Sequence, residues 1–363
     1  MALVRLTQID GKLPNLALMK LAHWHRSRGD EVVFTHSVRR DMLEPVWDFV
    51  YGSAIFSSSA DLVRIFVGEF PNAIVGGTGT DQTHTVEQVL GLNVLDYEHY
   101  DYSPYPDFKP SLGFSQRGCR LRCGFCVVPT KEGRARSVNT IADIWRGDPH
   151  PRQVVLLDND FFGQAPADWQ ARIAEIREGR FEVCFNQGLN LRALKEREAE
   201  ALASLRGAFR VPGRKRKDGS IRFKEVEDFL FRDASFSRPQ LYSAWDNLED
   251  EGKFMRGVDR LEAAGIPPDL LLVYMLVGYD PAETWESVMY RLNQMKARRM
   301  HPYPMIYRYK DRTLPLGRHP DVGGRTLRHF QRWVIRHAHE HTPFQHYDPN
   351  AKGWRDKDQF EIF

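Results

Sequence analysis

The feature that most constrains the fold is a repeated alternation of short apolar runs with longer amphipathic stretches. In the first hundred residues, apolar runs at 2–8, 31–36, 51–57 and 72–80 are separated by amphipathic stretches at 13–29 and 60–70. Strands that alternate with helices form parallel sheets, because each crossover helix returns the chain to the same edge. The sequence therefore predicts an α/β protein whose first part, residues 1–98, is a doubly wound parallel sheet.

The length of the chain indicates two domains. Its 363 residues exceed what one hydrophobic core usually supports. Residues 99–110 are rich in Tyr, Pro and Asp without periodicity, which predicts a linker. The alternation resumes over residues 111–312 with about six β-α units, the content of a partial (β/α)6 TIM-type barrel. Residues 313–363 are expected to form a C-terminal helical extension.

Residues 207–238 interrupt the second region. Their basic side chains surround Asp218-Gly219, a dipeptide that favours a tight hairpin turn. The segment 210–224 could contact the phosphates of a nucleic acid, whereas the ordinary interpretation of such a hairpin is a solvated surface, and we favour the latter. The chain as a whole, with a net charge of +3, has no strong electrostatic preference for nucleic acid.

Three of the four cysteines lie within eight residues. Cys119, Cys123 and Cys126 have the spacing C-x3-C-x2-C, directly after a predicted strand. Three thiolates can bind three irons of a four-iron four-sulfur cluster and leave the fourth iron open for a substrate. A three-cysteine zinc knuckle completed by a histidine remains an alternative. Cys184 lies in an apolar run and is most simply a small buried residue.

This spacing, with the aromatic Phe125 before the last cysteine, resembles the radical S-adenosylmethionine superfamily. The resemblance covers about residues 111–310. It implies that the open iron binds S-adenosylmethionine and that one electron cleaves it to methionine and a 5′-deoxyadenosyl radical, which abstracts hydrogen from a substrate that the sequence does not identify. An electron donor of the flavodoxin or ferredoxin type is implied as a partner. The rival from another class is a non-catalytic iron–sulfur or zinc protein that binds a nucleic acid or a protein partner.

Polar residues at the carboxyl ends of the predicted strands are the remaining candidates for the site. Barrels of this family bind S-adenosylmethionine at these ends, and the run LLDNDFFGQ resembles the family's segment for the methionyl amine. The resemblance implies contacts with the cofactor from Phe125, Asp158, Asn159, Gln187, Asn190, Ser243, Asp246 and Gly278. Further polar residues at these ends are Asp160, Asn186, Arg192, Asn247, Asp280 and Glu283. Helix capping is the alternative role for each of them.

The first region resembles the cobalamin-binding, Rossmann-like domain of flavodoxin type that precedes the barrel in one branch of the family. Ser57, Ser58 and the Gly76-Gly77-Thr78 turn carry this resemblance. It implies a cobalamin-dependent methyltransferase as an alternative function. The family's Asp-x-His-x-x-Gly segment is absent, and parallel sheets also use glycine-rich turns for structural reasons alone.

The remaining sequence features argue against a membrane protein. No apolar run approaches the roughly 18 residues of a membrane span. The N-terminal segment MALVRLTQIDGKLPN lacks the features of a secretory signal, so we expect a cytoplasmic protein with reduced thiols.

His337, His339, His341 and His346 suggest a metal site only superficially. On a helix, His337 and His341 would share a face, but no third ligand is evident, and a solvated helix end is the simpler interpretation.

Overall fold

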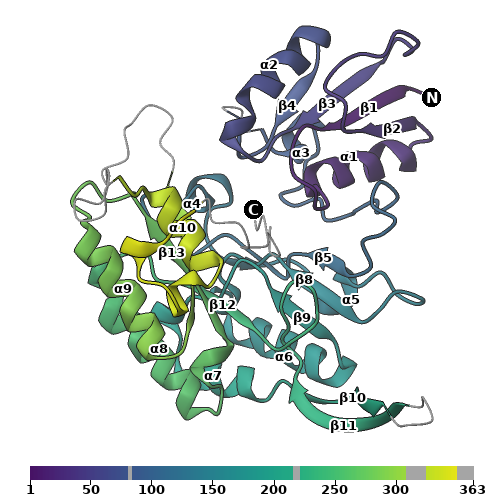
Figure 1. Cartoon of the computed structure of the whole chain (residues 1–363). Helices are drawn as coiled ribbons and strands as arrows, with labels where there is room; N and C mark the ends of the chain where they lie inside the picture. The colour runs from purple at the N-terminus through teal and green to yellow at the C-terminus, as the bar shows by residue number, and fades with distance from the viewer. Residues whose placement is uncertain (81–83, 216–220, 308–323, 350–363) are drawn as a thin grey trace. The chain divides into compact units, whose positions relative to one another are not determined.

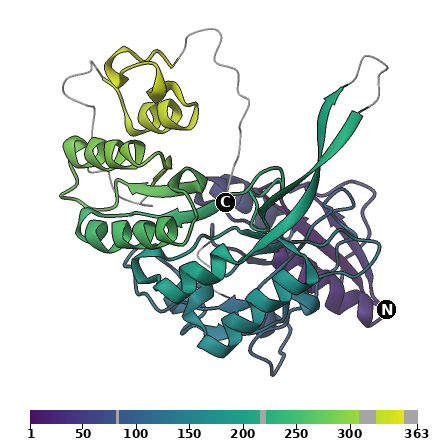
Figure 2. The ribbon, with the colours of Figure 1, turned by 90° about the horizontal axis from the view of Figure 1, so that it is seen from below.

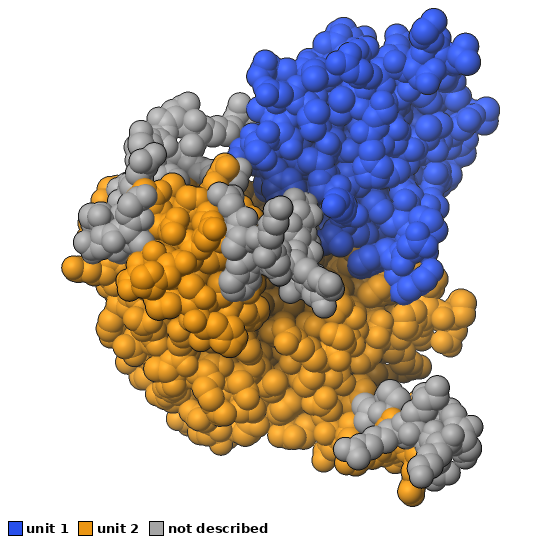
Figure 3. Space-filling view, in the orientation of Figure 1, with its two compact units in different colours: residues 1–109, 361–363 blue, residues 110–360 orange. Residues whose placement is uncertain are grey.

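A computed structural model of the chain describes residues 1–80, 84–215, 221–307 and 324–349. The chain divides into two compact units (Figure 3). The first unit is Met1–Lys109, and the second extends from Pro110. None of the helices described is long and apolar enough to cross a membrane.

The first unit is built on a four-stranded parallel sheet with the order β2-β1-β3-β4. Its strands are β1 (Leu3–Gln8), β2 (Glu31–Thr35), β3 (Phe49–Ser53) and β4 (Ile74–Gly76). This is the strand order of flavodoxin-type sheets, in which the direction of winding reverses between β1 and β3. The predicted parallel sheet is therefore confirmed.

Short helices connect these strands. They are α1 (Leu16–Ser27), η1 (Ser57–Ser59), α2 (Ala60–Glu69) and α3 (Val86–Val89). The Asn15 side chain caps α1 by accepting a hydrogen bond from the Leu18 backbone N–H. Leu18, Leu21 and Ala22 then pack against Val4 and Leu6 of β1.

The second unit contains two parallel sheets of three strands each. One has the order β5-β8-β9 and the other β12-β13-β14, with strands β5 (Ser111–Gly113), β8 (Gln153–Leu156), β9 (Glu182–Phe185), β12 (Leu241–Ala244), β13 (Leu271–Val277) and β14 (His301–Ile306). An isolated parallel bridge joins Leu189, just after β9, to Ser243 of β12. The pairing confirms the predicted parallel strands but shows two sheets rather than one barrel.

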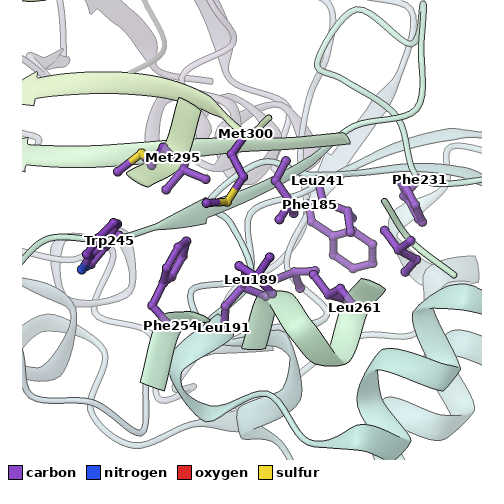
Figure 4. Packing of buried hydrophobic residues seen from close by; sticks show 14 of the residues in the cluster. Phe185, Leu189, Leu191, Phe231, Leu241, Trp245, Phe254, Leu261, Met295 and Met300 are labelled. Atoms are coloured by element: carbon purple, nitrogen blue, oxygen red, sulfur yellow. The ribbon is translucent and has the colours of Figure 1, made fainter. Parts of the chain in front are cut away.

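Four longer helices connect these strands and cover them (Figures 1 and 2). They are α6 (Pro166–Gly179), α7 (Glu196–Ala203), α8 (Glu251–Ala263) and α9 (Trp285–Ala297). Side chains of strands and helices form one large hydrophobic core, part of which is shown in Figure 4. There, Trp245 stacks on Phe254 of α8 with ring centroids 5.4 Å apart. Short elements complete the unit: α4 (Val128–Lys131), α5 (Ile141–Ile144), η2 (Phe161–Gly163), η3 (Leu191–Ala193), η4 (Leu248–Asp250) and η5 (Pro268–Leu270).

The insertion forms an antiparallel hairpin of β10 (Arg206–Lys215) and β11 (Ile221–Phe229). The predicted Asp218-Gly219 turn lies outside the described residues. At the C-terminal end are α10 (Leu327–Ile335), η7 (Ala338–Glu340) and η8 (Phe344–His346). His337 and His341 do not lie on one helix, because α10 ends at Ile335 and His337 has the left-handed φ of 55°.

Candidate functional site

The cysteine loop, residues 114–135, follows β5 and carries all three clustered cysteines. A short antiparallel pair, β6 (Gln116–Arg117) with β7 (Arg136–Ser137), closes it at its base. Gly118 begins the loop with a φ of 76°, and a Cβ atom there would lie 2.2 Å from the Arg134 carbonyl oxygen. Only glycine fits this close approach, so the base of the loop is fixed by backbone packing.

Asp158, at the end of β8, holds the start of the cysteine loop. Its Oδ1 atom accepts hydrogen bonds from the backbone N–H groups of Ser115 (2.7 Å) and Gln116 (3.0 Å), and its Oδ2 atom bonds the Ser115 hydroxyl. The carboxyl group is buried, and burial raises its pKa to about 7. Asp158 thus engages the protein's own polar groups at the start of the cysteine loop.

Two more acidic side chains hold the same loop. Asp160 forms a two-pronged ion pair with Arg120, with Nε–Oδ2 and Nη2–Oδ1 distances of 2.8 and 2.9 Å. Glu132 accepts hydrogen bonds from the Gly118 N–H and from the Asn159 amide, at 3.0 and 2.9 Å. Asn159 thus also binds the loop. Carboxylates at the end of β8 position the cysteines rather than face a shared cavity.

The three thiols are half-buried. Burial raises the pKa of Cys119 to about 11 and also raises the pKa of Cys126. A metal that binds such thiols deprotonates them, which offsets this cost. Within the described ranges, no three His, Cys, Asp or Glu side chains form a group that could hold a metal ion. The ligands of a four-iron cluster each bind a different iron and so need not converge on one point.

A pocket of about 670 Å³ opens beside the cysteine loop. Cys123 and Phe125 line it from the loop, and Asp246 lines it from the carboxyl end of β12. Residues that follow β9, β12 and β13, together with one residue of α9, complete its polar wall: Arg192, Asn247, Asp250, Tyr279, Asp280, Glu283 and Arg291. The structure thus brings together seven of the predicted residues: Cys123, Phe125, Arg192, Asp246, Asn247, Asp280 and Glu283. Burial raises the pKa of Asp246, although nearby Arg192 acts in the opposite direction.

Arg192 connects the pocket to a cysteine. Its Nη2 atom lies 3.6 Å from Cys123 Sγ, and its Nη1 atom donates to Asp250 Oδ2 at 2.6 Å. Burial acts to raise the pKa of Asp250, but the hydrogen bonds from Arg192 and Lys253 hold it below its ordinary value. A half-buried cation at this place can attract an anionic group or stabilise a thiolate.

Arg291 of α9 joins the ends of β12 and β13 and was missed by the sequence analysis. Its Nη1 atom donates to the carbonyl oxygens of Trp245, Asp246 and Leu276, at 3.1, 2.9 and 3.0 Å. Its Nη2 atom bonds Glu283, which in turn accepts from the Gly278 N–H at 2.6 Å. This buried network holds the strand ends that line the pocket. The sequence signal is a charge on an apolar helix face, between Val288, Leu292 and Met295.

Tyr279, also missed, covers the cysteine loop from the other side of the pocket. Its ring makes an edge contact with Phe125, with ring centroids 5.3 Å apart. A Cβ atom at Gly124 would lie 2.6 Å from the Tyr279 hydroxyl oxygen, so the ring sits directly against the loop backbone. Together the two aromatic rings form the apolar part of the pocket wall next to Cys123.

Four other predicted residues do not line this pocket: Gln187, Asn190, Ser243 and Gly278. Gln187 is exposed, and the Ser243 hydroxyl is buried and donates to the Leu189 carbonyl oxygen at 2.8 Å. Gly278 is buried, with a φ of 83°. The amide atoms of Asn190 are buried, and neither has a hydrogen-bond partner among the described residues. Asn247 and Asp280 cap the backbone N–H groups of Asp250 and Ala282, the alternative role considered for them.

The glycine-rich turn of the first unit has a structural explanation. A Cβ atom on Gly77, whose φ is 108°, would lie 2.1 Å from the Ala54 carbonyl oxygen, and one on Gly79 would lie 2.5 Å from Phe56 backbone atoms. The Thr78 hydroxyl donates to the Ile55 carbonyl oxygen at 3.1 Å. The turn after β4 therefore packs directly on the turn after β3.

The switch point between β1 and β3 is filled by the protein itself. The Tyr105 hydroxyl donates to Gln8 and accepts from the Asn15 N–H, at 2.7 and 3.0 Å, while the Asn15 amide donates to the Ser53 hydroxyl at 2.9 Å. In the described part of this unit, no buried polar side-chain atom lacks a partner. Ligands of such sheets bind at this point, so these residues do not fit a corrinoid there.

No protein-family model matches the chain, and none of the curated proteins matches it. The functional argument therefore depends on the residues of the cysteine loop and of the pocket beside it.

Proposed function

We propose that this protein is a radical S-adenosylmethionine enzyme whose four-iron four-sulfur cluster is held by Cys119, Cys123 and Cys126. The observation that carries the proposal is that the cysteine loop opens, through Cys123 and Phe125, onto a charged pocket at the carboxyl ends of parallel strands. When bound, such a cluster supplies the electron that cleaves S-adenosylmethionine to a 5′-deoxyadenosyl radical, which removes hydrogen from a substrate.

The pocket residues have separate tasks in this proposal. Arg192 is placed to attract the methionyl carboxylate, and Asp246 to accept a hydrogen bond from the methionyl ammonium group. Burial raises the pKa of Asp246, and the nearby Arg192 acts in the opposite direction, in favour of the ionised form. Phe125 and Tyr279 keep water from the reacting region.

The proposal also implies how the strands of the second unit are arranged. We propose that the two parallel sheets of the second unit are the halves of one partial (β/α)6 barrel over residues 111–312. The bridge between Leu189 and Ser243 supports this arrangement, because it joins the segment after β9 to β12. The first unit then serves as a scaffold, and an electron donor of flavodoxin or ferredoxin type completes the system. No step of this proposal uses a corrinoid.

The proposal is tested by electron paramagnetic resonance of the anaerobically reconstituted, reduced protein. We expect the signal of a reduced four-iron cluster, and a changed signal when S-adenosylmethionine binds the open iron. Cys123→Ala should lose the signal, while Cys184→Ala, at a buried cysteine outside the loop, should keep it. Two results would support a non-catalytic iron–sulfur or zinc protein instead: a chain that binds only zinc, or a cluster whose signal does not change when S-adenosylmethionine is added.

A further inference from the structure

The β10–β11 hairpin concentrates positive charge that the composition of the whole chain conceals. Residues 206–229 contain eight basic residues and four acidic residues, a net charge of +4. Because the whole chain is +3, the rest of the chain is net −1. The near balance of the composition therefore gives no guide to this segment, whose local field is strongly positive.

The hairpin extends away from the rest of the second unit (Figures 1 and 2). Its strands have 10 and 9 residues. Phe229 is buried and Phe209 packs against the core, whereas Arg210, Arg222, Phe223 and Lys224 are exposed. A two-stranded ribbon without further support is marginally stable in water. Burial within the fold therefore does not explain why this ribbon is so long. Contact with a partner would explain its length.

The described side chains of the outer ribbon combine cations with an exposed ring. Phe223 is 52% exposed, and the guanidinium of Arg210 lies over it, 5.2 Å from the ring centroid. Arg222 and Lys224, its neighbours in sequence, are exposed and point to the opposite face of the ribbon, since strand residues alternate. An aromatic ring available for stacking and flanked by cations matches the needs of an unpaired base within a phosphate chain.

We propose that the β10–β11 hairpin is a docking surface for RNA that presents unpaired bases. An acidic peptide would account for the cations but gives no role to the exposed ring of Phe223, and one exposed ring offers little apolar area for insertion into an anionic membrane. The major groove of duplex RNA is deep and narrow, whereas RNA loops offer bases that can stack on a side chain. This inference does not depend on the proposed function, because binding can be measured on protein without a cluster.

The test is fluorescence anisotropy of a labelled stem-loop RNA with the full chain, over a series of salt concentrations. The variant Arg210→Gln/Arg222→Gln/Lys224→Gln should bind at least about 10-fold more weakly, and the slope of log affinity against log salt should fall by about 2, as expected for three lost contacts with single-stranded phosphates. Its matched control, Arg64→Gln/Arg177→Gln/Arg256→Gln, removes three exposed cations elsewhere and should bind as the unaltered chain does.

Variants of Phe223 distinguish binding by base stacking from binding by electrostatic attraction alone. Phe223→Ala should weaken binding to the stem-loop by about 10-fold, Phe223→Tyr should retain it, and neither should change binding to a fully paired RNA of equal length. The proposal is overturned if the triple variant binds like its control, if Phe223→Ala has no effect, or if anionic vesicles or a polyglutamate peptide compete as well as unlabelled RNA.

Discussion

The Nη2 atom of Arg192 lies 3.6 Å from the Sγ atom of Cys123, and the same guanidinium is held on its other side by Asp250. Arg192 is therefore fixed between the cysteine loop and the wall of the pocket. A cation that contacts a cysteine sulfur stabilises the negative charge on a metal-bound thiolate. This relationship connects the proposed cluster ligand to the proposed cofactor pocket.

Replacing Arg192 should change both the cluster and cofactor binding. We expect Arg192→Gln to lower the reduction potential of the cluster, because hydrogen bonds and positive charge near the sulfurs raise it. Loss of a charge-assisted hydrogen bond should also weaken S-adenosylmethionine binding by about 10-fold or more. Potentiometric and binding titrations measure the two effects. Arg192→Lys keeps the charge, so its reduction potential and its affinity for S-adenosylmethionine should lie between those of the unaltered chain and of Arg192→Gln. If neither variant changes the potential or the affinity, Arg192 does not have this role.

Asp158 should make stability depend on pH. Burial raises its pKa from 3.8 in the unfolded chain to about 7 in the folded chain. Between these values the folded chain holds a proton that the unfolded chain releases, so the free energy of unfolding should fall as pH rises, by at most about 1.4 kcal/mol per unit. Urea unfolding at several pH values measures this slope.

Asp158→Asn is the matched variant for that measurement. The amide oxygen can accept from the Ser115 and Gln116 N–H groups, and the amide nitrogen can donate to the Ser115 hydroxyl, so the contacts remain while the titration is lost. The difference in unfolding free energy between the two proteins should therefore vary with pH across this window. A constant difference would show that Asp158 does not titrate there.

Arg291, in the middle of α9, should be essential for stability, in contrast to Arg298 at the C-terminal end of the same helix. Arg291→Met leaves three carbonyl oxygens and the Glu283 carboxylate without their buried partner, at an expected cost of about 3–5 kcal/mol. Arg298 is partly exposed and pairs with Asp259 and Glu262, so Arg298→Met should cost about 1 kcal/mol or less. Equal losses in urea unfolding would contradict the assigned network.

The glycine turn of the first unit provides a further test. Gly77→Ala should destabilise the protein by more than about 1 kcal/mol, because of its positive φ and the close Ala54 carbonyl. At the adjacent Gly76, a Cβ atom would meet nothing within 4 Å, so Gly76→Ala should be tolerated. Thermal unfolding compares them. If both variants are fully stable, the glycines are not there for packing, and a ligand role becomes the better explanation.

The sequence predicted the parallel sheets because alternating strands and helices leave few other arrangements. The flavodoxin-type order β2-β1-β3-β4 and the long helices α6, α8 and α9 match that pattern. The curvature that would make six strands into a barrel depends on how two sheets meet, and no apolar pattern encodes that contact.

For the site, the sequence indicated the strand ends but not which side chains remain available there. Asp158, Asn159 and Ser243 stand at the predicted places, yet each is engaged with the protein's own polar groups. Arg291 and Tyr279 reach the pocket through contacts far apart in sequence. Only the folded chain shows which polar groups satisfy one another.

The most direct test of the central claim is the detection of 5′-deoxyadenosine by mass spectrometry, after anaerobic reconstitution and addition of dithionite and S-adenosylmethionine. The account predicts 5′-deoxyadenosine and methionine from the unaltered chain and from Cys184→Ala, and neither product from Cys123→Ala. A fully loaded four-iron cluster that yields no 5′-deoxyadenosine would contradict it.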